Sequence, residues 1–244
     1  MPRKRPTSPA FAISTSTSAL SPPPLLLGHR GARRYAPENT VAAFELALAH
    51  GCDGFEFDVR LTADRHCVIC HDPRLAGLDI ASSRYQQLAS GTPCLPDVLE
   101  RFAASAFLDI ELKVSGLESD VAAMVRDHPP QRGYFISSFL PQVIERLCAA
   151  DKSLPLGLIC DSQRQLAAGI RLPVQALFLE HRLATAAIVE TLHAASKKVF
   201  VWTVNREREM RRFAQITVDG IISDDTKLLA NALGEKNKTR GLSS

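Results

Sequence analysis

Carboxylate side chains interrupt two apolar segments of the sequence. Glu56 and Asp58 lie within residues 55–59, and Glu111 lies within residues 107–113. In a strand, residues two apart share a face, so Glu56 and Asp58 would point the same way. Buried carboxylates need a compensating charge, and their oxygens suit a hard divalent cation. The sequence therefore predicts a site for Mg²⁺ or Ca²⁺ at these three residues. The alternative is three solvated carboxylates on a rim.

Two histidines are candidates for proton transfer. His29 and His71 each end an apolar segment and precede a charged residue, Arg30 and Asp72 respectively. An imidazole can be protonated or neutral near pH 7, so two of them can supply one acid and one base. We therefore expect the pair to be catalytic rather than structural.

Arg30 and Lys113 add fixed positive charge near these groups. Lys113 lies two residues after Glu111, so the two would share a strand face. Arginine can hold phosphate oxygens through two parallel hydrogen bonds. These residues predict an anionic substrate, with phosphate as the obvious candidate.

Eight apolar segments alternate with segments of helical periodicity. The expected strands are 25–29, 55–59, 107–113, 134–138, 156–160, 176–180, 199–203 and 220–223, and the expected helices are 40–50, 117–128, 141–150, 163–168, 185–196, 207–214 and 226–233. Strands that are apolar almost throughout are typical of parallel sheets covered on both faces. The pattern predicts an α/β fold, a (β/α)8 TIM barrel, with the reactive residues at the C-terminal ends of its strands. An open doubly wound sheet is the alternative.

One apolar segment does not fit this repeat. Residues 67–71 follow the second strand too closely for a parallel crossover, which needs a dozen or more residues. We expect a β-hairpin after strand 2, with a turn near Ala63 and Asp64. This hairpin would bring His71 beside Asp58 at the mouth of the barrel.

The motifs together resemble the glycerophosphodiester phosphodiesterase family. The matching segments are 28–32 (GHRGA), 37–40 (PENT), 55–58 (FEFD), 68–72 (VICHD), 110–113 (IELK), 201–205 (VWTVN) and 218–224 (VDGIISD). The resemblance covers about residues 25–233 and implies a metal-dependent hydrolase that cleaves a small-molecule glycerophosphodiester into glycerol 3-phosphate and an alcohol. It implies acid–base roles for His29 and His71, metal ligation by Glu56, Asp58 and Glu111, phosphate contacts from Arg30 and Lys113, and a pocket-lining role for Trp202.

The sequence departs from the family pattern in two places. Many members carry a longer insertion where this chain has only residues 73–94, so we expect a more open pocket. Ser223 stands where a threonine is usual. Both departures bear on the leaving alcohol rather than on the reaction. Within the PENT segment, we expect Asn39 to cap the first helix rather than to take part in catalysis.

Two other functions remain open at this point. The same site could release the head group of a lysophospholipid, as a lysophospholipase D does. The barrel could instead bind phosphodiesters without turnover, in which case a histidine or a carboxylate of the set would be expected to be missing. None is missing from this sequence.

Composition excludes several classes of protein. No apolar run approaches the roughly 20 residues of a membrane span, so we expect no stable membrane insertion. The net charge is +3, but residues 1–24 contribute three positive charges and residues 235–244 two, which leaves −2 for residues 25–234. We therefore expect no nucleic-acid partner. The sequence carries no signal for an oligomeric state.

Both ends of the sequence differ from its middle. Residues 1–24 hold six prolines and no acidic residue, which predicts a disordered tail, and residues 235–244 form a polar tail. The catalytic domain is expected to span residues 25–234. The six cysteines lie in apolar surroundings, which favours reduced thiols and a cytoplasmic location. Cys67 and Cys70 would point to opposite faces of a strand, which argues against a metal or redox pair.

Overall fold

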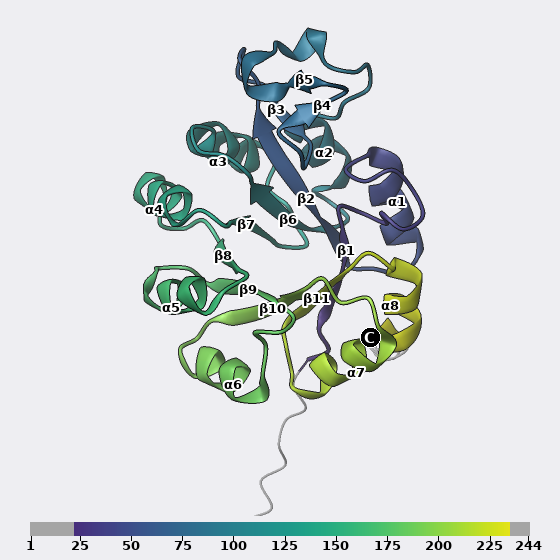
Figure 1. Ribbon diagram of the computed structural model, residues 1–244, viewed down its shortest axis with the longest axis vertical. Helices are drawn as coiled ribbons and strands as arrows, with labels where there is room; N and C mark the ends of the chain where they lie inside the picture. Colours follow the sequence, from purple (N-terminus) through teal and green to yellow (C-terminus); the bar gives the residue numbers. More distant parts are fainter. Residues whose placement is uncertain (1–21, 235–244) are drawn as a thin grey trace, which may run out of the picture.

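Eight parallel strands close into a barrel in the computed structural model, which describes residues 22–234 (Figure 1). The strands are β1 (Leu25–His29), β2 (Gly54–Leu61), β6 (Phe107–Leu112), β7 (Tyr134–Ser138), β8 (Leu156–Cys160), β9 (Ala176–Glu180), β10 (Lys198–Trp202) and β11 (Gly220–Ser223). They pair in chain order, and β11 pairs with β1 to close the ring. The predicted (β/α)8 barrel is confirmed, and the open sheet is excluded.

Helices follow the barrel strands and surround them on the outside (Figure 1). They are α1 (Val41–Ala49), α2 (Leu95–Phe102), α3 (Glu118–Asp127), α4 (Pro141–Ala150), α5 (Gln163–Arg171), α6 (Ala186–Ala194), α7 (Glu207–Gln215) and α8 (Thr226–Leu233). Helix α2 has no counterpart among the expected helices. Its buried residues Leu95, Val98, Leu99 and Phe102 do follow helical spacing. The pattern spans only eight residues, so it is a weak signal beside those of the longer helices.

Aromatic rings fill the interior of the barrel below its mouth. Phe178 and Phe200 stack with ring centroids 4.7 Å apart, and Phe107 and Phe135 pack beside them. Gly157 makes room for this layer, because a Cβ atom there would lie 2.4 Å from the ring of Phe178. The barrel is therefore closed from below by an apolar floor, and the site above it opens only at the C-terminal ends of the strands.

The predicted hairpin is confirmed. Strand β3 (Cys67–Ile69) runs antiparallel to β2, with Val59 opposite Ile69. The amide of Cys70 donates to the carbonyl of Asp58 at 3.0 Å, so the next residue, His71, reaches the barrel mouth. The β2–β3 hairpin thus places His71 in the site.

A small subdomain follows the hairpin and projects from one side of the barrel (Figure 1). It contains β4 (Arg74–Leu75), β5 (Leu78–Asp79) and the short 3₁₀ helices Ile80–Ser82 and Tyr85–Gln87. A separate apolar cluster that includes Val68, Ile80 and Leu88 holds it together.

The two predicted tails lie outside the described residues, apart from residues 22–24. Within residues 22–234, every helix is too short or too polar to span a bilayer. All six cysteines are free and five are buried, as expected for small apolar residues. Burial raises the pKa of Cys67 to about 12, so this thiol stays protonated.

Candidate active site

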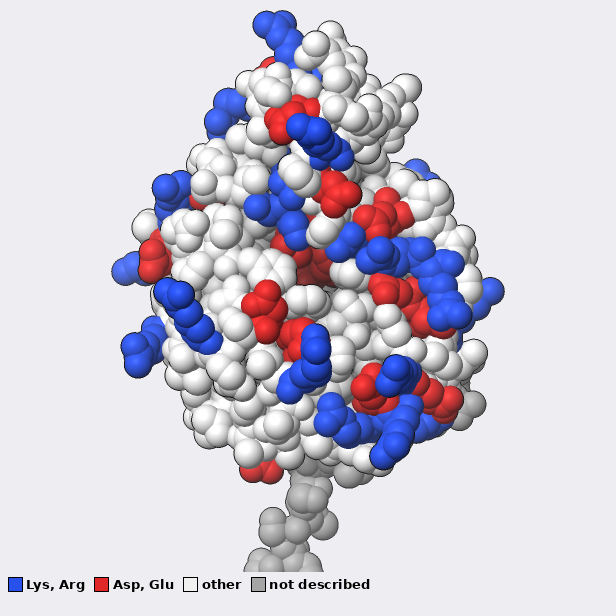
Figure 2. Space-filling model, in the orientation of Figure 1, with Lys and Arg blue, Asp and Glu red and all other residues white. Residues whose placement is uncertain are grey.

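The predicted site residues meet around one cavity at the mouth of the barrel. The cavity has a volume of about 110 Å³ and is lined by His29, Arg30, Glu56, His71, Asp109, Glu111, Lys113, Phe139, Ile159, Phe178, Trp202 and Ile222. Figure 2 shows a hollow with acidic side chains inside it near the centre of this face. Asp58 is the one predicted residue that does not line the cavity; it lies behind the wall and is 1% exposed.

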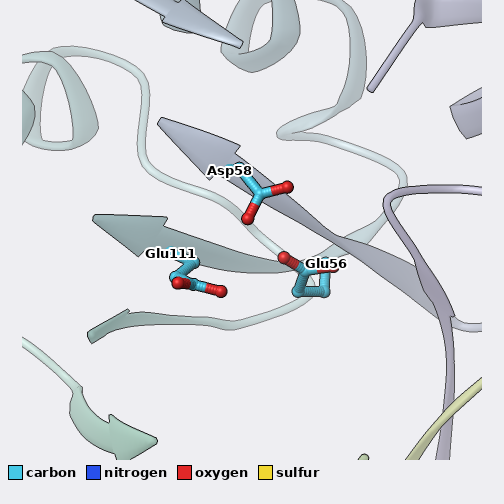
Figure 3. A group of neighbouring side chains, drawn as sticks. All are labelled: Glu56, Asp58 and Glu111. Atoms are coloured by element: carbon cyan, nitrogen blue, oxygen red, sulfur yellow. The ribbon is translucent and has the colours of Figure 1, made fainter. Parts of the chain in front are cut away.

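The three carboxylates converge from two neighbouring strands (Figure 3). Glu56 and Asp58 alternate along β2, and Asp58 is in register with Glu111 on β6. One oxygen from each residue can be chosen so that all three lie within 4.8 Å of one another. The two-residue spacing and the parallel register together therefore build the predicted cluster.

Burial and mutual repulsion govern the ionisation of this cluster. Burial, together with the charges of Asp58 and Glu111, raises the pKa of Glu56 well above its usual range. The same two causes, burial and Asp58, raise the pKa of Glu111 to about 7. Burial would also raise the pKa of Asp58, but Lys113, Arg30 and the amide of Asn39 hold it below its usual range. Burial and repulsion therefore disfavour the simultaneous ionisation of all three groups, and further positive charge would favour it.

The cluster fits a hard divalent cation. Glu56 Oε1 is buried and has no hydrogen-bond partner among the described residues. Asp58 Oδ1 and Glu111 Oε1 also lack an aligned hydrogen bond, although Lys113 Nζ lies 3.3 and 2.7 Å from them. Each of the three carboxylates thus has a buried oxygen without an aligned hydrogen bond. Carboxylate oxygens are the ligands that Mg²⁺ and Ca²⁺ prefer. A divalent charge here would also remove the repulsion between the carboxylates.

A tight turn after β1 presents Arg30 to this cluster. Its backbone has φ 52°, and its N–H donates to Glu56 Oε2 at 2.8 Å. The side chain reaches Asp58 Oδ2 at 3.3 Å through Nε and Glu38 Oε1 at 2.8 Å through Nη1. Gly31 has φ 79°, and a Cβ atom there would lie 2.6 Å from the backbone of Ala43. The turn therefore requires glycine at this position.

His29 is held by a residue from the last strand–helix junction of the barrel. Its Nδ1 lies 2.7 Å from Asp224 Oδ1, and Asn205 Nδ2 donates to Asp224 Oδ2 at 2.7 Å. Burial would raise the pKa of Asp224, but the hydrogen bonds from His29 and Asn205 hold it below its usual range. A carboxylate only accepts, so Nδ1 carries a proton. Nε2 makes no hydrogen bond within residues 22–234 and lies 3.9 Å from Glu56 Oε2.

His71 has a similar but more exposed arrangement. Its Nδ1 lies 2.8 Å from Asp72 Oδ1, and the two side chains are 32% and 73% exposed. Burial, only partly offset by Asp72 and Asp58, lowers the pKa of His71. As with His29, the carboxylate partner leaves Nε2 free. Each histidine therefore has one ring nitrogen available for proton transfer.

Aromatic side chains form the wall of the cavity beside these groups. Trp202 Nε1 donates to the carbonyl of Phe178 at 3.0 Å, and its ring meets Phe139 edge-to-face at 5.5 Å. Lys113 Nζ lies 5.5 Å from the ring centroid of Phe139. Trp202 thus lies on the wall of the cavity.

The expected role of Asn39 is wrong. The cap of helix α1 is Thr40, whose hydroxyl accepts from the amide of Ala43. Asn39 is buried with φ 59°, and its Nδ2 donates to Asp58 Oδ2 at 2.8 Å. The left-handed backbone turns this side chain inward, toward the carboxylate cluster rather than the helix end.

Three further residues of the site are absent from the sequence-based set. Asp224 and Asn205 lie far from His29 in sequence, so no local spacing connects them. Asp109 could have been identified from the sequence, because it lies two residues before Glu111 and therefore on the same face of β6. It lines the cavity, is 1% exposed and accepts a hydrogen bond from Ser137 Oγ at 2.7 Å. Burial raises its pKa well above the usual range.

Known proteins share both the sequence pattern and the architecture. Residues 29–228 match the glycerophosphoryl diester phosphodiesterase family. The chain is 29% identical over 234 residues to a glycerophosphodiester phosphodiesterase of Caldanaerobacter subterraneus subsp. tengcongensis, covering 85% of this chain and 96% of that protein. It is 30% identical over 245 residues to the probable glycerophosphodiester phosphodiesterase 2 of Mycobacterium tuberculosis, covering 86% and 90%.

Solved structures of other proteins have a similar fold. The glycerophosphodiester phosphodiesterase of Thermotoga maritima superposes with a TM-score of 0.74 at 26% identity, covering 85% of this chain and 97% of that one. A phosphodiesterase of Oleispira antarctica, solved with the product sn-glycerol-3-phosphate, gives 0.78 at 24% identity, covering 87% and 97%. The family match covers most of the barrel and includes the site residues from His29 to Asp224. This chain is a member of the glycerophosphoryl diester phosphodiesterase family of enzymes.

Proposed function

We propose that this protein hydrolyses glycerophosphodiesters to glycerol 3-phosphate and an alcohol, with His29 and His71 as the acid–base pair and Mg²⁺ or Ca²⁺ held by Glu56, Asp58 and Glu111. The observation that carries the proposal is that both histidines line the same small cavity as Glu56, Glu111, Arg30 and Lys113, with Asp58 completing the carboxylate cluster. Each histidine keeps Nε2 free because Nδ1 is bound to a carboxylate. The family membership is consistent with this activity.

Arg30 and Lys113 bind and orient the phosphate in this proposal. Both side chains are about nine-tenths buried and line the cavity, so their charges act where solvent screening is weak. When bound, a divalent cation neutralises phosphate oxygens and polarises the phosphorus centre. The fixed cations and the carboxylate cluster therefore favour a diester that carries one negative charge.

The two histidines move the protons. One imidazole removes the proton from the substrate hydroxyl adjacent to the phosphodiester, and that oxygen attacks phosphorus. The other imidazole protonates the departing alcohol, which leaves a cyclic phosphate. Water then opens the ring while the two histidines exchange roles. Placing the nucleophile within the substrate makes the first step intramolecular, which lowers its entropic cost.

A turnover screen with the purified full chain tests this proposal. Glycerophosphocholine, other glycerophosphodiesters and a lysophospholipid are incubated with and without Mg²⁺, Ca²⁺ and a chelator. We expect release of glycerol 3-phosphate from the diesters, no turnover in chelator and recovery when cation is restored. Glu111→Gln should be inactive, and Glu100→Gln, which changes an exposed carboxylate outside the site, should serve as its control.

Three results would contradict the proposal or favour an alternative to it. Full turnover in excess chelator would refute the cation site. Tight binding of diesters without turnover of any of them would indicate the non-catalytic alternative. Preferential release of a head group from the lysophospholipid would favour the lysophospholipase D alternative.

A further inference from the structure

Asp109 lines the cavity from β6, two residues before Glu111 and in register with Glu56 of β2. Strand β6 and the residue after it place Asp109, Glu111 and Lys113 on one face in succession. At about 3.3 Å per residue, Asp109 lies about 7 Å from Glu111 along the strand. Because Glu56 lies at the same level on β2, Asp109 is placed beside the carboxylate cluster.

The Asp109 carboxyl is only half engaged by the protein. Ser137 Oγ donates to Oδ1 at 2.7 Å, which fixes the orientation of the side chain. Oδ2 has no hydrogen-bond partner within residues 22–234, and the residue is 1% exposed while it lines the cavity. Oδ2 therefore borders the cavity, where a ligand hydroxyl can form a hydrogen bond with it.

Asp109 also lies outside the cation cluster. The three carboxylates whose oxygens approach within 4.8 Å are Glu56, Asp58 and Glu111. Apolar side chains of Ile159, Phe178 and Ile222 line the same cavity. A few placed polar atoms among apolar side chains are the usual means by which a small pocket fixes the orientation of its ligand.

We propose that Asp109 is a specificity-determining residue that hydrogen-bonds the terminal hydroxyl of the glycerol moiety. The inference rests on the proposed function. With phosphate near Arg30 and Lys113, a glycerol group that extends into the cavity can bring its far hydroxyl to Asp109 Oδ2. A lysophospholipid esterified at that hydroxyl has no free hydroxyl group to hydrogen-bond with Asp109. Asp109 therefore selects deacylated glycerophosphodiesters.

The test compares two substrates within each enzyme. The first is glycerophosphocholine, and the second is 2-hydroxypropyl phosphocholine, which keeps the attacking hydroxyl but has a methyl group in place of the terminal CH₂OH. Effects of a substitution on cation binding or proton transfer act on both substrates and cancel in the ratio of their kcat/KM values. The variants are Asp109→Leu, Asp109→Ala and Asp109→Asn. The control Ile159→Val trims the same wall without a polar atom.

We expect the unaltered protein to prefer glycerophosphocholine by roughly 10- to 100-fold, the range for one hydrogen bond to a buried charged or polar partner. The preference should fall to nearly 1 in Asp109→Leu and Asp109→Ala. It should be largely kept in Asp109→Asn, whose amide leaves a polar atom in place, and in Ile159→Val. A leucine or alanine variant that keeps the preference, or an asparagine variant that loses it as fully as leucine, overturns the inference.

A binding measurement covers the case in which the variants do not fold. The dissociation constants of glycerol 3-phosphate and 2-hydroxypropyl phosphate are measured by calorimetry on the unaltered full chain with cation present. Tighter binding of glycerol 3-phosphate by roughly 10-fold or more is expected, and equal binding overturns the inference. Tighter binding of glycerol 3-phosphate without hydrolysis of either diester would support the role of Asp109 and refute the proposed hydrolysis instead.

Discussion

His29 and Asp224 join the first and last strands of the barrel at its mouth, with Nδ1 and Oδ1 2.7 Å apart. Asp224 is itself fixed by Asn205, which donates through Nδ2 and accepts from the Asp224 amide through Oδ1 at 2.9 Å. A carboxylate so fixed holds both the orientation and the tautomer of the imidazole. His29 is thus oriented by groups that become its neighbours only when the barrel closes.

Asp224→Asn should lower kcat by on the order of 10²-fold. The amide that replaces the carboxylate can donate to Nδ1, which would leave the proton on Nε2 and the wrong tautomer for a base. Steady-state kinetics across pH checks this, together with the melting temperature to exclude a folding defect. Asp72→Asn is the matched comparison at His71 and should be milder, because Asp72 is 73% exposed and water can replace it. Equal effects of the two substitutions would contradict this difference.

Cation binding should depend on pH through Glu111. Its pKa is raised to about 7, so at pH 6 the folded protein without cation carries a proton there that a cation must displace. Added Mg²⁺ or Ca²⁺ should therefore raise the melting temperature more at pH 8 than at pH 6. The same temperature shift at both pH values would show that Glu111 does not compete for the proton and the cation.

Without cation, the contribution of Glu111 to the stability of the folded protein should decrease as pH rises. Because the folded pKa of Glu111 is above its ordinary value of 4.5, the folded state binds more protons than the unfolded state between about pH 4.5 and 7. The contribution of this group to stability is fully present below about pH 4.5 and is lost as pH rises to about 7. Denaturant titrations in chelator should show that decline in the unaltered protein and a weaker one in Glu111→Gln.

Local spacing predicted the parts of the site that lie within one strand or one hairpin. Glu56 with Asp58, and Glu111 with Lys113, follow from alternation, and the position of His71 follows from the short hairpin. The strand bounds 25–29, 134–138, 156–160, 176–180 and 220–223 are likewise as expected, because their apolar runs are buried on both faces.

Contacts between distant segments could not be predicted in this way. Asp224 lies 195 residues from His29, and the residue that Asn39 contacts depends on a left-handed backbone turn. In both cases the sequence shows a polar residue in a loop, which is as compatible with a solvated side chain as with a site. Only the closed barrel brings such residues to their partners.

Asn39→Gly should weaken cation binding by roughly 10- to 100-fold, the usual effect of losing a residue that orients a metal ligand. Glycine tolerates the positive φ of this position, so the substitution removes the amide that donates to Asp58 without straining the backbone. Calorimetric titration with Mg²⁺ or Ca²⁺ measures the change. Thr40→Ala is the control: it removes the cap of α1 and costs about 1 kcal/mol of stability, but should leave cation affinity unaltered.

A substrate analogue tests the source of the nucleophile. If the hydroxyl adjacent to the phosphodiester attacks phosphorus, an analogue without that hydroxyl should bind but hardly react. Binding survives because Arg30 and Lys113 contact phosphate oxygens that the analogue keeps. Turnover collapses because an intramolecular nucleophile can have an effective molarity of about 10⁵ M or more. Competition assays measure the binding, and phosphorus NMR would detect the cyclic product from the natural substrate.

The histidine variants complete this test. His29→Ala and His71→Ala should each slow turnover by on the order of 10² to 10⁴, the range for a lost acid or base. The double variant should lose less than the product of the two, because groups that act as a unit are not additive. Rapid hydrolysis of the analogue would contradict the mechanism through a cyclic phosphate and indicate direct attack by water. His29 and His71 would then orient that water and protonate the departing alcohol, and both single variants would still be slow.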